Sequence, residues 1–305
     1  MAEKQPIAYN TMGLLEFQAR FPGERECYDY LMKMRFSEGF LCPQCGSSTF
    51  GSIVTRNLWQ CKNCRSQISV TTGTMFHRTR TPLQYWFWAI FLTAKDKRGH
   101  SALQLSKELD ISYDKAWLMV HKIRAAMSYR DTLYRLDGIV EMDDAYFGAP
   151  APGKRGRGTQ RAKAIVAIGL TKDNKPRFVK IQTIKRLDAR SVKAFAASGI
   201  ARGSIVRTDG LHGYRCLSEL GFSHEAGVAS DKVNGGLLHW VHIIISDAKA
   251  FMTGTFHGLD DKHIQRYLDE FCYRFNRRYR EAELFDRLLL ACTTAPSVTY
   301  DELTR

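Results

Sequence analysis

Two Cys-x-x-Cys motifs near the N-terminus constrain the fold of this chain more than any other feature. They are Cys42-Pro-Gln-Cys45 and Cys61-Lys-Asn-Cys64, with fifteen residues between them. Each turn lets two thiolates reach one ion, and two such turns complete a tetrahedral zinc site. The intervening segment is rich in Gly and Ser and then in β-branched and aromatic residues, as expected of a hairpin between metal-binding turns. We therefore predict a zinc ribbon over residues 37–72. Its four thiolates leave no coordination position open for catalysis, so the zinc is structural.

The charge balance of the chain indicates a polyanionic partner. Among 305 residues, 45 Lys and Arg stand against 31 Asp and Glu, a net charge of +14. Such an excess favours nucleic acid or an anionic membrane surface. The longest apolar run, residues 85–94, is about half the length that a membrane span needs, and the N-terminus lacks the features of a signal peptide. We therefore expect a cytoplasmic protein that binds nucleic acid.

Helical patterns account for most of the first 130 residues outside the ribbon. Residues 1–36 form an N-terminal helical segment. Further along, residues 100–127 contain two amphipathic stretches around a turn, with Ser112 as the cap of the second. A short helix, a tight turn and a longer helix are typical of a helix-turn-helix and also of a plain helical hairpin. Beside a zinc ribbon in a basic protein, we favour a DNA-binding helix-turn-helix region over residues 80–130. Its second helix would contact DNA through Lys115, Lys122 and Arg124.

From about residue 137 the pattern changes to strands. Four segments are rich in Val, Ile and aromatic residues and are bounded by Gly or Pro: residues 138–148, 162–171, 176–184 and 203–210. One helical pattern, 188–198, lies between the third and fourth strands, and two more, 237–255 and 261–293, follow them. This order predicts an α/β domain with a mixed sheet flanked by helices over residues 135–293.

A Pro- and Gly-rich loop, residues 149–163, follows the first of these strands. It carries five basic residues and no acidic one. A solvated hairpin linker is one interpretation. We favour contact with a phosphate backbone, because the loop lies beside a strand that carries carboxylates. The basic residues concerned are Lys154, Arg155, Arg157, Arg161 and Lys163.

Three acidic residues in the segment Ile139–Tyr146 are unusual for an apolar strand. Glu141 and Asp143 share one face of that strand, and Asp209 ends another strand just before a glycine. If the two strands are neighbours, Asp143 and Asp209 converge, and such carboxylates repel each other unless a cation lies between them. Mg²⁺ or Mn²⁺ ions held there would support in-line phosphoryl transfer. The alternative is that both residues only cap turns.

The chain resembles the zinc-ribbon insertion-sequence transposases of bacteria, which are related to the eukaryotic Merlin transposons. The resemblance covers most of residues 12–290, in the right order. It implies an RNase H-like domain with a DDE-type metal triad that cuts and joins double-stranded DNA at the terminal inverted repeats of an element. It also implies a nucleoid-associated protein that acts as a homodimer or higher oligomer on DNA. The matching motifs are "FLCPQCGSS", "GIVEMDDAYFG", "GKRGRGTQRAKAIVAIG", "RTDGLHGY" and "DAKAFMTGTFHGLDDKHIQRYLDEFCYRFNRR".

By this resemblance, Asp143 is the first metal ligand and Asp209 the second. The third position departs from the family pattern: Asp247 stands where close relatives have Asn, and His242 precedes Lys249 by the seven residues that separate Glu and Lys in other members. On a helix, His242 and Asp247 point about 140° apart, so both cannot face one metal. We favour Asp247, because a carboxylate suits Mg²⁺ better than an imidazole does. Lys249 would contact the DNA backbone.

Two further functions remain open at this point. The chain could be a non-catalytic zinc-ribbon and helix-turn-helix regulator that derives from a transposase. It could also be a nuclease that hydrolyses DNA without joining it. Both alternatives keep zinc and salt-sensitive DNA binding, and only strand cleavage and strand transfer separate the three.

Overall fold

The structure is a computed structural model that describes residues 12–53, 56–148, 161–227, 238–256 and 259–304. The chain forms two compact units. Unit 1 comprises Met1–Asp96, Ala102–Ala126 and Tyr279–Thr304, and unit 2 comprises Lys97–Ser101 and Met127–Arg278. The last helices therefore pack with the N-terminal residues, whereas the sequence pattern grouped residues up to 293 with the α/β domain.

Unit 1 is largely helical. Its helices are α1 (Leu14–Arg20), α2 (Glu24–Arg35), α3 (Leu83–Lys95), α4 (Ala102–Glu108), the first part of α5 (Tyr113–Thr132), α9 (Leu284–Thr294) and α10 (Tyr300–Thr304). Aromatic rings hold them together: the buried ring of Phe17 lies 4.3 Å from that of Phe91 and 5.4 Å from that of Phe285. This contact between α1, α3 and α9 explains why the C-terminal helices belong to this unit.

A small three-stranded antiparallel sheet carries the cysteine motifs. Its strands are β1 (Phe50–Ile53), β2 (Leu58–Cys61) and β3 (Gln67–Ser69). The predicted hairpin between the two cysteine pairs is thus present. Arg35 at the end of α2 donates to the carbonyl oxygens of Ser69, Val70 and Thr72, which ties the strand end to the helix.

Helices α4 and α5 reproduce the predicted short helix, turn and longer helix. The turn contains Asp110 at φ +49°, and Ser112 begins α5 by accepting a hydrogen bond from the Lys115 amide at 3.5 Å. The prediction of a single helical stretch over residues 261–293 is wrong. It forms α8 (Ile264–Phe275) and α9, which lie in different units.

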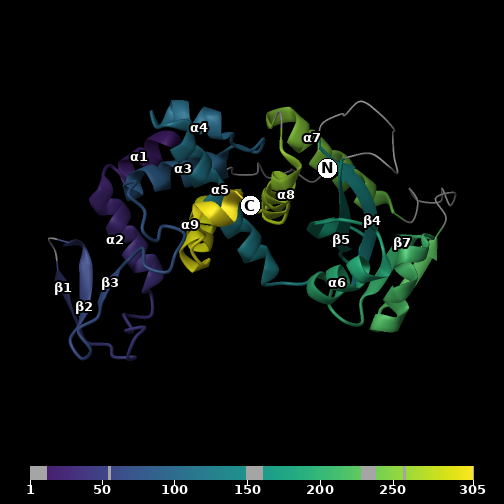
Figure 1. The fold of residues 1–305 in the computed structure, drawn as a ribbon, viewed down its shortest axis with the longest axis horizontal. Coiled ribbons are helices and arrows are strands. Elements are labelled where there is room, and N and C mark those ends of the chain that lie inside the picture. The colour runs from purple at the N-terminus through teal and green to yellow at the C-terminus, as the bar shows by residue number, and fades with distance from the viewer. Residues whose placement is uncertain (1–11, 54–55, 149–160, 228–237, 257–258, 305) are drawn as a thin grey trace, which may run out of the picture. The chain divides into compact units, whose positions relative to one another are not determined.

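Unit 2 contains a five-stranded mixed sheet (Figure 1). Its strands, in the order in which they lie, are β6 (Pro176–Ile184), β5 (Ala162–Leu170), β4 (Ile139–Phe147), β7 (Ile205–Asp209) and β8 (Ser223–Gly227). The first three are antiparallel, whereas β7 runs parallel to both β4 and β8. Strand β8 escaped the sequence analysis because its residues, "SHEAG", lack an apolar pattern. The predicted mixed α/β architecture is confirmed.

Helices cover both faces of this sheet (Figure 1). Ala145 and Phe147 of β4 pack with α7 (His239–Thr255) and α8. Val140 and Met142 point the other way, toward α6 (Ala189–Gly199) and the 3₁₀ helix η2 (His212–Leu220). Odd-numbered side chains of β4 therefore face α7, as the period of two in a strand requires.

Side chains of α8 occupy the outer edge of β6. The Gln265 amide accepts from the Thr183 amide and donates to the Ile181 carbonyl, and Asn276 bonds both backbone groups of Val179. These bonds satisfy an edge strand that would otherwise offer a template for pairing. Among the residues that the structure describes, no helix has the length and apolarity needed to cross a membrane.

Candidate active site and zinc-binding module

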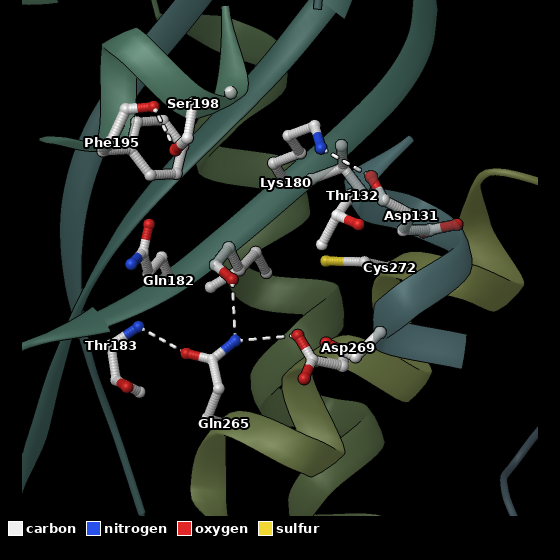
Figure 2. A pocket seen from close by; sticks show the side chains of 14 residues that line it. Asp131, Thr132, Lys180, Gln182, Thr183, Phe195, Ser198, Gln265, Asp269 and Cys272 are labelled. Atoms are coloured by element: carbon white, nitrogen blue, oxygen red, sulfur yellow. Dashed lines mark hydrogen bonds between the residues drawn. The ribbon is translucent and has the colours of Figure 1, made fainter. Parts of the chain in front are cut away.

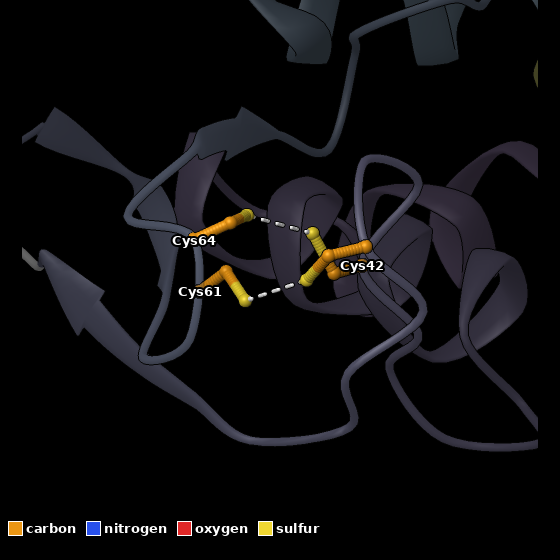
Figure 3. Close-up of side chains that lie close together, drawn as sticks. Cys42, Cys61 and Cys64 are labelled. Atoms are coloured by element: carbon orange, nitrogen blue, oxygen red, sulfur yellow. Dashed lines mark hydrogen bonds between the residues drawn. The ribbon is translucent and has the colours of Figure 1, made fainter.

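Cys42, Cys45, Cys61 and Cys64 converge at the base of the small sheet (Figure 3). The Sγ atoms of Cys42 and Cys64 are 3.6 Å apart, as are those of Cys45 and Cys61. Tetrahedral zinc with bonds of about 2.3 Å sets thiolates about 3.8 Å apart, so the four sulfurs fit one zinc ion. Within the described part of the chain, they alone bring three or more ligand atoms of Cys, His, Asp or Glu within 4.8 Å of one another.

The Ser66 hydroxyl favours the thiolate forms of Cys42 and Cys64. The Ser66 hydroxyl lies 3.3 Å from the Cys42 sulfur and 3.0 Å from the Cys64 sulfur. Its hydrogen bond lowers the pKa of Cys42 to about 6 and also lowers the pKa of Cys64. Asn63 donates to Cys45 at 3.7 Å. Hydrogen bonds of this kind orient metal ligands and stabilise their charge.

Asp143 and Asp209 lie on the adjacent parallel strands β4 and β7, close enough for the charge of Asp209 to act on Asp143. The parallel ladder pairs Ile139 with Ile205 and ends at Glu141 and Arg207, two residues before Asp143 and Asp209. Asp209 is the last residue of β7. Burial raises the pKa of Asp143, and the charges of Asp209 and Asp144 raise it further. Carboxylates that disfavour each other's ionisation are a candidate site for a hard divalent cation, whose oxygen ligands they would supply.

His242, near the start of α7, reaches Asp143. Its Nε2 lies 3.2 Å from Oδ2 of Asp143, and its side chain stays 58% exposed against 15% for Asp143. Asp143 is further oriented by its Oδ1, which accepts from the Asp144 amide at 2.7 Å. The structure thus brings together three of the five predicted catalytic residues, one from each of β4, β7 and α7.

The remaining two predicted catalytic residues are the exposed Asp247 and Lys249 of α7. No contact that we observe joins either of them to Asp143, whereas Asp209, Asp144 and His242 all act on the charge of Asp143. Five residues along a helix turn Asp247 about 140° from His242. The face of α7 that meets Asp143 is therefore the face of His242.

Asp144 points to the opposite face of the sheet and forms an ion pair with Lys163 at 2.9 Å. Both side chains are largely buried, at 12% and 15% exposure. Lys163, predicted to bind DNA, therefore has a carboxylate partner within the fold. Arg161 immediately precedes β5 and is partly exposed. The predicted DNA-binding residues Lys154, Arg155 and Arg157 lie outside the described residues.

The three basic residues predicted to read DNA from α5 have different environments. Lys115 is exposed. Lys122 is 8% exposed and donates to the Met75 carbonyl at 3.3 Å, and Arg124 is 2% exposed. Burial of these two side chains argues against their contact with DNA, because little of either is exposed to solvent. A pattern of basic residues on one helix did not reveal this.

Tyr214 is a buried residue on the other face of the sheet, close enough to the carboxylates to respond to their charges, and the sequence analysis did not single it out. It lies on η2, five residues after Asp209, and is fully buried. Burial raises its pKa, and the charges of Asp144, Asp143 and Asp209 act in the same direction. Its hydroxyl has no hydrogen-bond partner among the described residues. The only sequence signal was its place in the "TDGLHGY" motif.

A separate cavity of about 440 Å³ opens between β6, α6 and α8 (Figure 2). Asp269 lines it, bonded to Gln265, and so does Lys180, whose Nζ donates to the Asp131 carbonyl. Burial raises the pKa of Asp269 to about 6. None of the predicted site residues lines this cavity.

The fold and the cysteine site together define a zinc-ribbon protein with a mixed α/β domain that carries paired carboxylates. Comparison with known families identifies both parts. Residues 22–67 match the transposase zinc-ribbon domain, and residues 135–276 match the ISXO2-like transposase domain. A relative from Halobacterium salinarum, described as an uncharacterized protein in transposable element ISH50, is 25% identical over 214 residues, which cover 65% of this chain and 71% of the relative.

These matches confirm the predicted resemblance: the chain carries a transposase zinc-ribbon domain and an ISXO2-like transposase domain, and its relative belongs to a transposable element. The match to the zinc-ribbon domain also agrees with the observed cluster of four cysteines, so the assignment of a zinc ribbon rests on both sequence family and geometry.

Proposed function

We propose that this chain is a metal-dependent DNA transposase, which cuts DNA at the ends of an insertion sequence and joins those ends to target DNA. The observation that carries the proposal is the meeting of Asp143 and Asp209 on adjacent parallel strands, with His242 at 3.2 Å from Asp143. A buried carboxylate of raised pKa beside an aspartate at the end of the adjacent parallel strand is typical of a site that binds a divalent cation.

The oxygen ligands of Asp143 and Asp209 suit Mg²⁺ or Mn²⁺. When bound, two such ions would stabilise the attacking and leaving oxygens of an in-line displacement at phosphorus. The protein would hold the two carboxylates at fixed separation through the β4–β7 ladder. The Asp144 amide would keep one oxygen of Asp143 oriented, leaving the other facing His242 and the DNA.

For the third residue of the site we propose His242 in place of Asp247. The 3.2 Å contact between His242 and Asp143 supports this choice, whereas Asp247 is exposed on another face of α7. Mg²⁺ prefers oxygen ligands, but a side chain can bind the metal only if it reaches the site, and His242 is the residue of α7 that contacts Asp143. Lys249, exposed on the same helix, stays a candidate for contact with the DNA backbone.

DNA binding would follow from the excess of basic residues. Lys115 at the exposed start of α5 fits a helix-turn-helix that enters a DNA groove. Arg161 and the predicted basic loop before it fit contact with phosphates near the carboxylates. The mixed sheet with helices on both faces supports an RNase H-like fold. We further propose that a homodimer or higher oligomer holds the two element ends together in the nucleoid.

Cleavage of DNA that carries the ends of the encoding element tests this proposal. Wild-type protein should nick such DNA with Mg²⁺ or Mn²⁺ and form joined products with a target plasmid. Asp143→Asn and Asp209→Asn should abolish both products while the affinity for DNA persists. His242→Ala should lower the rate far more than Asp247→Ala does.

The non-catalytic regulator is the competing function. If the wild-type protein binds the element ends in a salt-dependent manner but cuts them with neither ion, the transposase proposal fails and the regulator stands. Cleavage without joined products would instead identify a nuclease.

A further inference from the structure

Glu141 is a buried carboxylate that bonds the start of helix α7. It lies on β4, two residues before Asp143, and is 2% exposed. Its Oε2 accepts a hydrogen bond from the Val241 amide at 2.8 Å, and the neighbouring Trp240 amide also acts to lower the pKa of Glu141. These are the second and third residues of α7, which begins at His239. The first amides of a helix have no partner within the helix.

Helix α7 has no cap of its own. Leu238, the residue before the helix, has no side-chain oxygen and makes no capping bond. Glu141 therefore takes the role that Ser, Thr, Asp or Asn usually fills, but from a strand distant in sequence. A carboxylate at this position also interacts favourably with the helix dipole. Because burying a charge is costly without such partners, the bonds fix Glu141 and the first turn of α7 to each other.

This cap lies next to the residue that reaches the metal site. Val241, bonded by Glu141, immediately precedes His242, whose Nε2 lies 3.2 Å from Asp143. Glu141 and Asp143 are on one face of β4 and contact consecutive residues of α7. The two contacts together fix where the first turn of α7 lies along β4 and how that turn is rotated about the helix axis.

We propose that Glu141 is a positioning residue, which holds His242 against Asp143 by capping helix α7 from strand β4. The inference rests on the proposed function for its effect on catalysis, although the cap itself can be measured without catalysis. Glu141 acts through His242 and does not contact the reacting atoms. The sequence suggested only that Glu141 could assist the neighbouring carboxylates.

Hydrogen exchange of the amides of Trp240 and Val241 tests the cap directly. In the zinc-loaded full chain, Glu141→Ala should make both amides exchange about tenfold faster, the factor that the loss of a typical cap produces. Glu141→Gln retains an acceptor oxygen of the same reach and should keep most of the protection. Because Gln has nearly the same volume as Glu, this variant also leaves no buried cavity and can be studied if Glu141→Ala folds poorly. This measurement needs no cleavage of DNA.

Cleavage kinetics test the positioning. Glu141→Ala should lower the rate of nicking by on the order of 100-fold, as a misplaced group does, without weakening DNA binding. Glu141→Gln should restore most of that rate. In a His242→Ala background, Glu141→Ala should have little further effect, because the two residues act in series. Asp188→Ala is the matched control: Asp188 caps α6 by accepting from Ser191 at 2.8 Å, on the other face of the sheet, and its loss should leave cleavage unchanged.

Three results would overturn the inference. One is unchanged exchange at Trp240 and Val241 in Glu141→Ala. Another is full additivity of the Glu141→Ala and His242→Ala effects on rate. The third is a Gln variant as impaired as the Ala variant, which would show that the charge of Glu141, and not its hydrogen bonds, matters. If wild-type protein cuts no DNA, the proposed function fails while the exchange measurement still decides the cap.

Discussion

Replacing Asp269 by Asn should make unit 2 more stable at neutral pH. Asp269 lies on α8 and lines the cavity beside β6 (Figure 2). Burial raises its pKa from 3.8 to about 6, against the opposing effect of hydrogen bonds from Gln265 and Ser128. An acid with a higher pKa in the folded chain destabilises the fold once it ionises. The penalty is absent below pH 3.8, grows up to about pH 6 and is constant above.

The size of this penalty follows from the pKa shift. A shift from 3.8 to about 6 corresponds to about 3 kcal/mol, at about 1.4 kcal/mol per pKa unit. Because the cavity is open to water, part of the carboxylate is solvated, and we expect about 1–3 kcal/mol. The amide that Asp269→Asn introduces is neutral at every pH, so the variant gains this amount relative to wild type between about pH 4 and 7.

Hydrogen exchange of peptides from β5 and α8 measures the opening free energy of unit 2 in both proteins. Comparing them at the same pH cancels the intrinsic pH dependence of exchange. Asp173→Asn, at an exposed position between β5 and β6, is the control and should show no such trend. A difference between Asp269→Asn and wild type that stays constant from pH 4 to 7, or that shrinks as pH rises, would refute the reasoning.

Three further predictions concern the zinc site, a buried ion pair and a glycine. Cys61→Ser should remove about one zinc per chain, measured by elemental analysis. Cys27→Ser, at a buried cysteine outside the cluster, should retain the zinc. Equal zinc content in the two variants would contradict the site. Arg274→Ala removes one partner of Glu270, whose side chain is 0% exposed, and should destabilise unit 2 by about 1.5–3 kcal/mol. The more exposed Arg287→Ala should cost less than about 1 kcal/mol. Similar losses, measured by urea unfolding, would count against the burial argument. Gly99 has φ +86°, and an added Cβ would lie 2.7 Å from Phe256. Gly203 has a similar φ of +79° but open space around it, so Gly99→Ala should lower the melting temperature more than Gly203→Ala does. Equal melting temperatures would show that the clash is relieved.

The sequence determined the elements that local patterns encode. Spacing within and between the Cys-x-x-Cys pairs was sufficient for the zinc ribbon, because a tetrahedral site needs only two short turns and a hairpin. Segments rich in Val, Ile and aromatic residues and bounded by Gly or Pro located β4, β5, β6 and β7 to within two residues at each end. The position of Asp209 at a strand end was likewise readable, since a glycine follows it.

The tertiary structure decided what depends on contacts between distant residues. The pattern over residues 261–293 could not show that α9 packs its Phe285 on Phe17, because helical periodicity does not identify the partner of an apolar face. Nor could the basic residues of α5 show that Lys122 and Arg124 are buried. Which residue of α7 contacts Asp143, here His242, depends on how α7 is rotated against β4. That rotation is set by bonds from Glu141 and Asp143, about 100 residues earlier in the chain, and no local pattern records it.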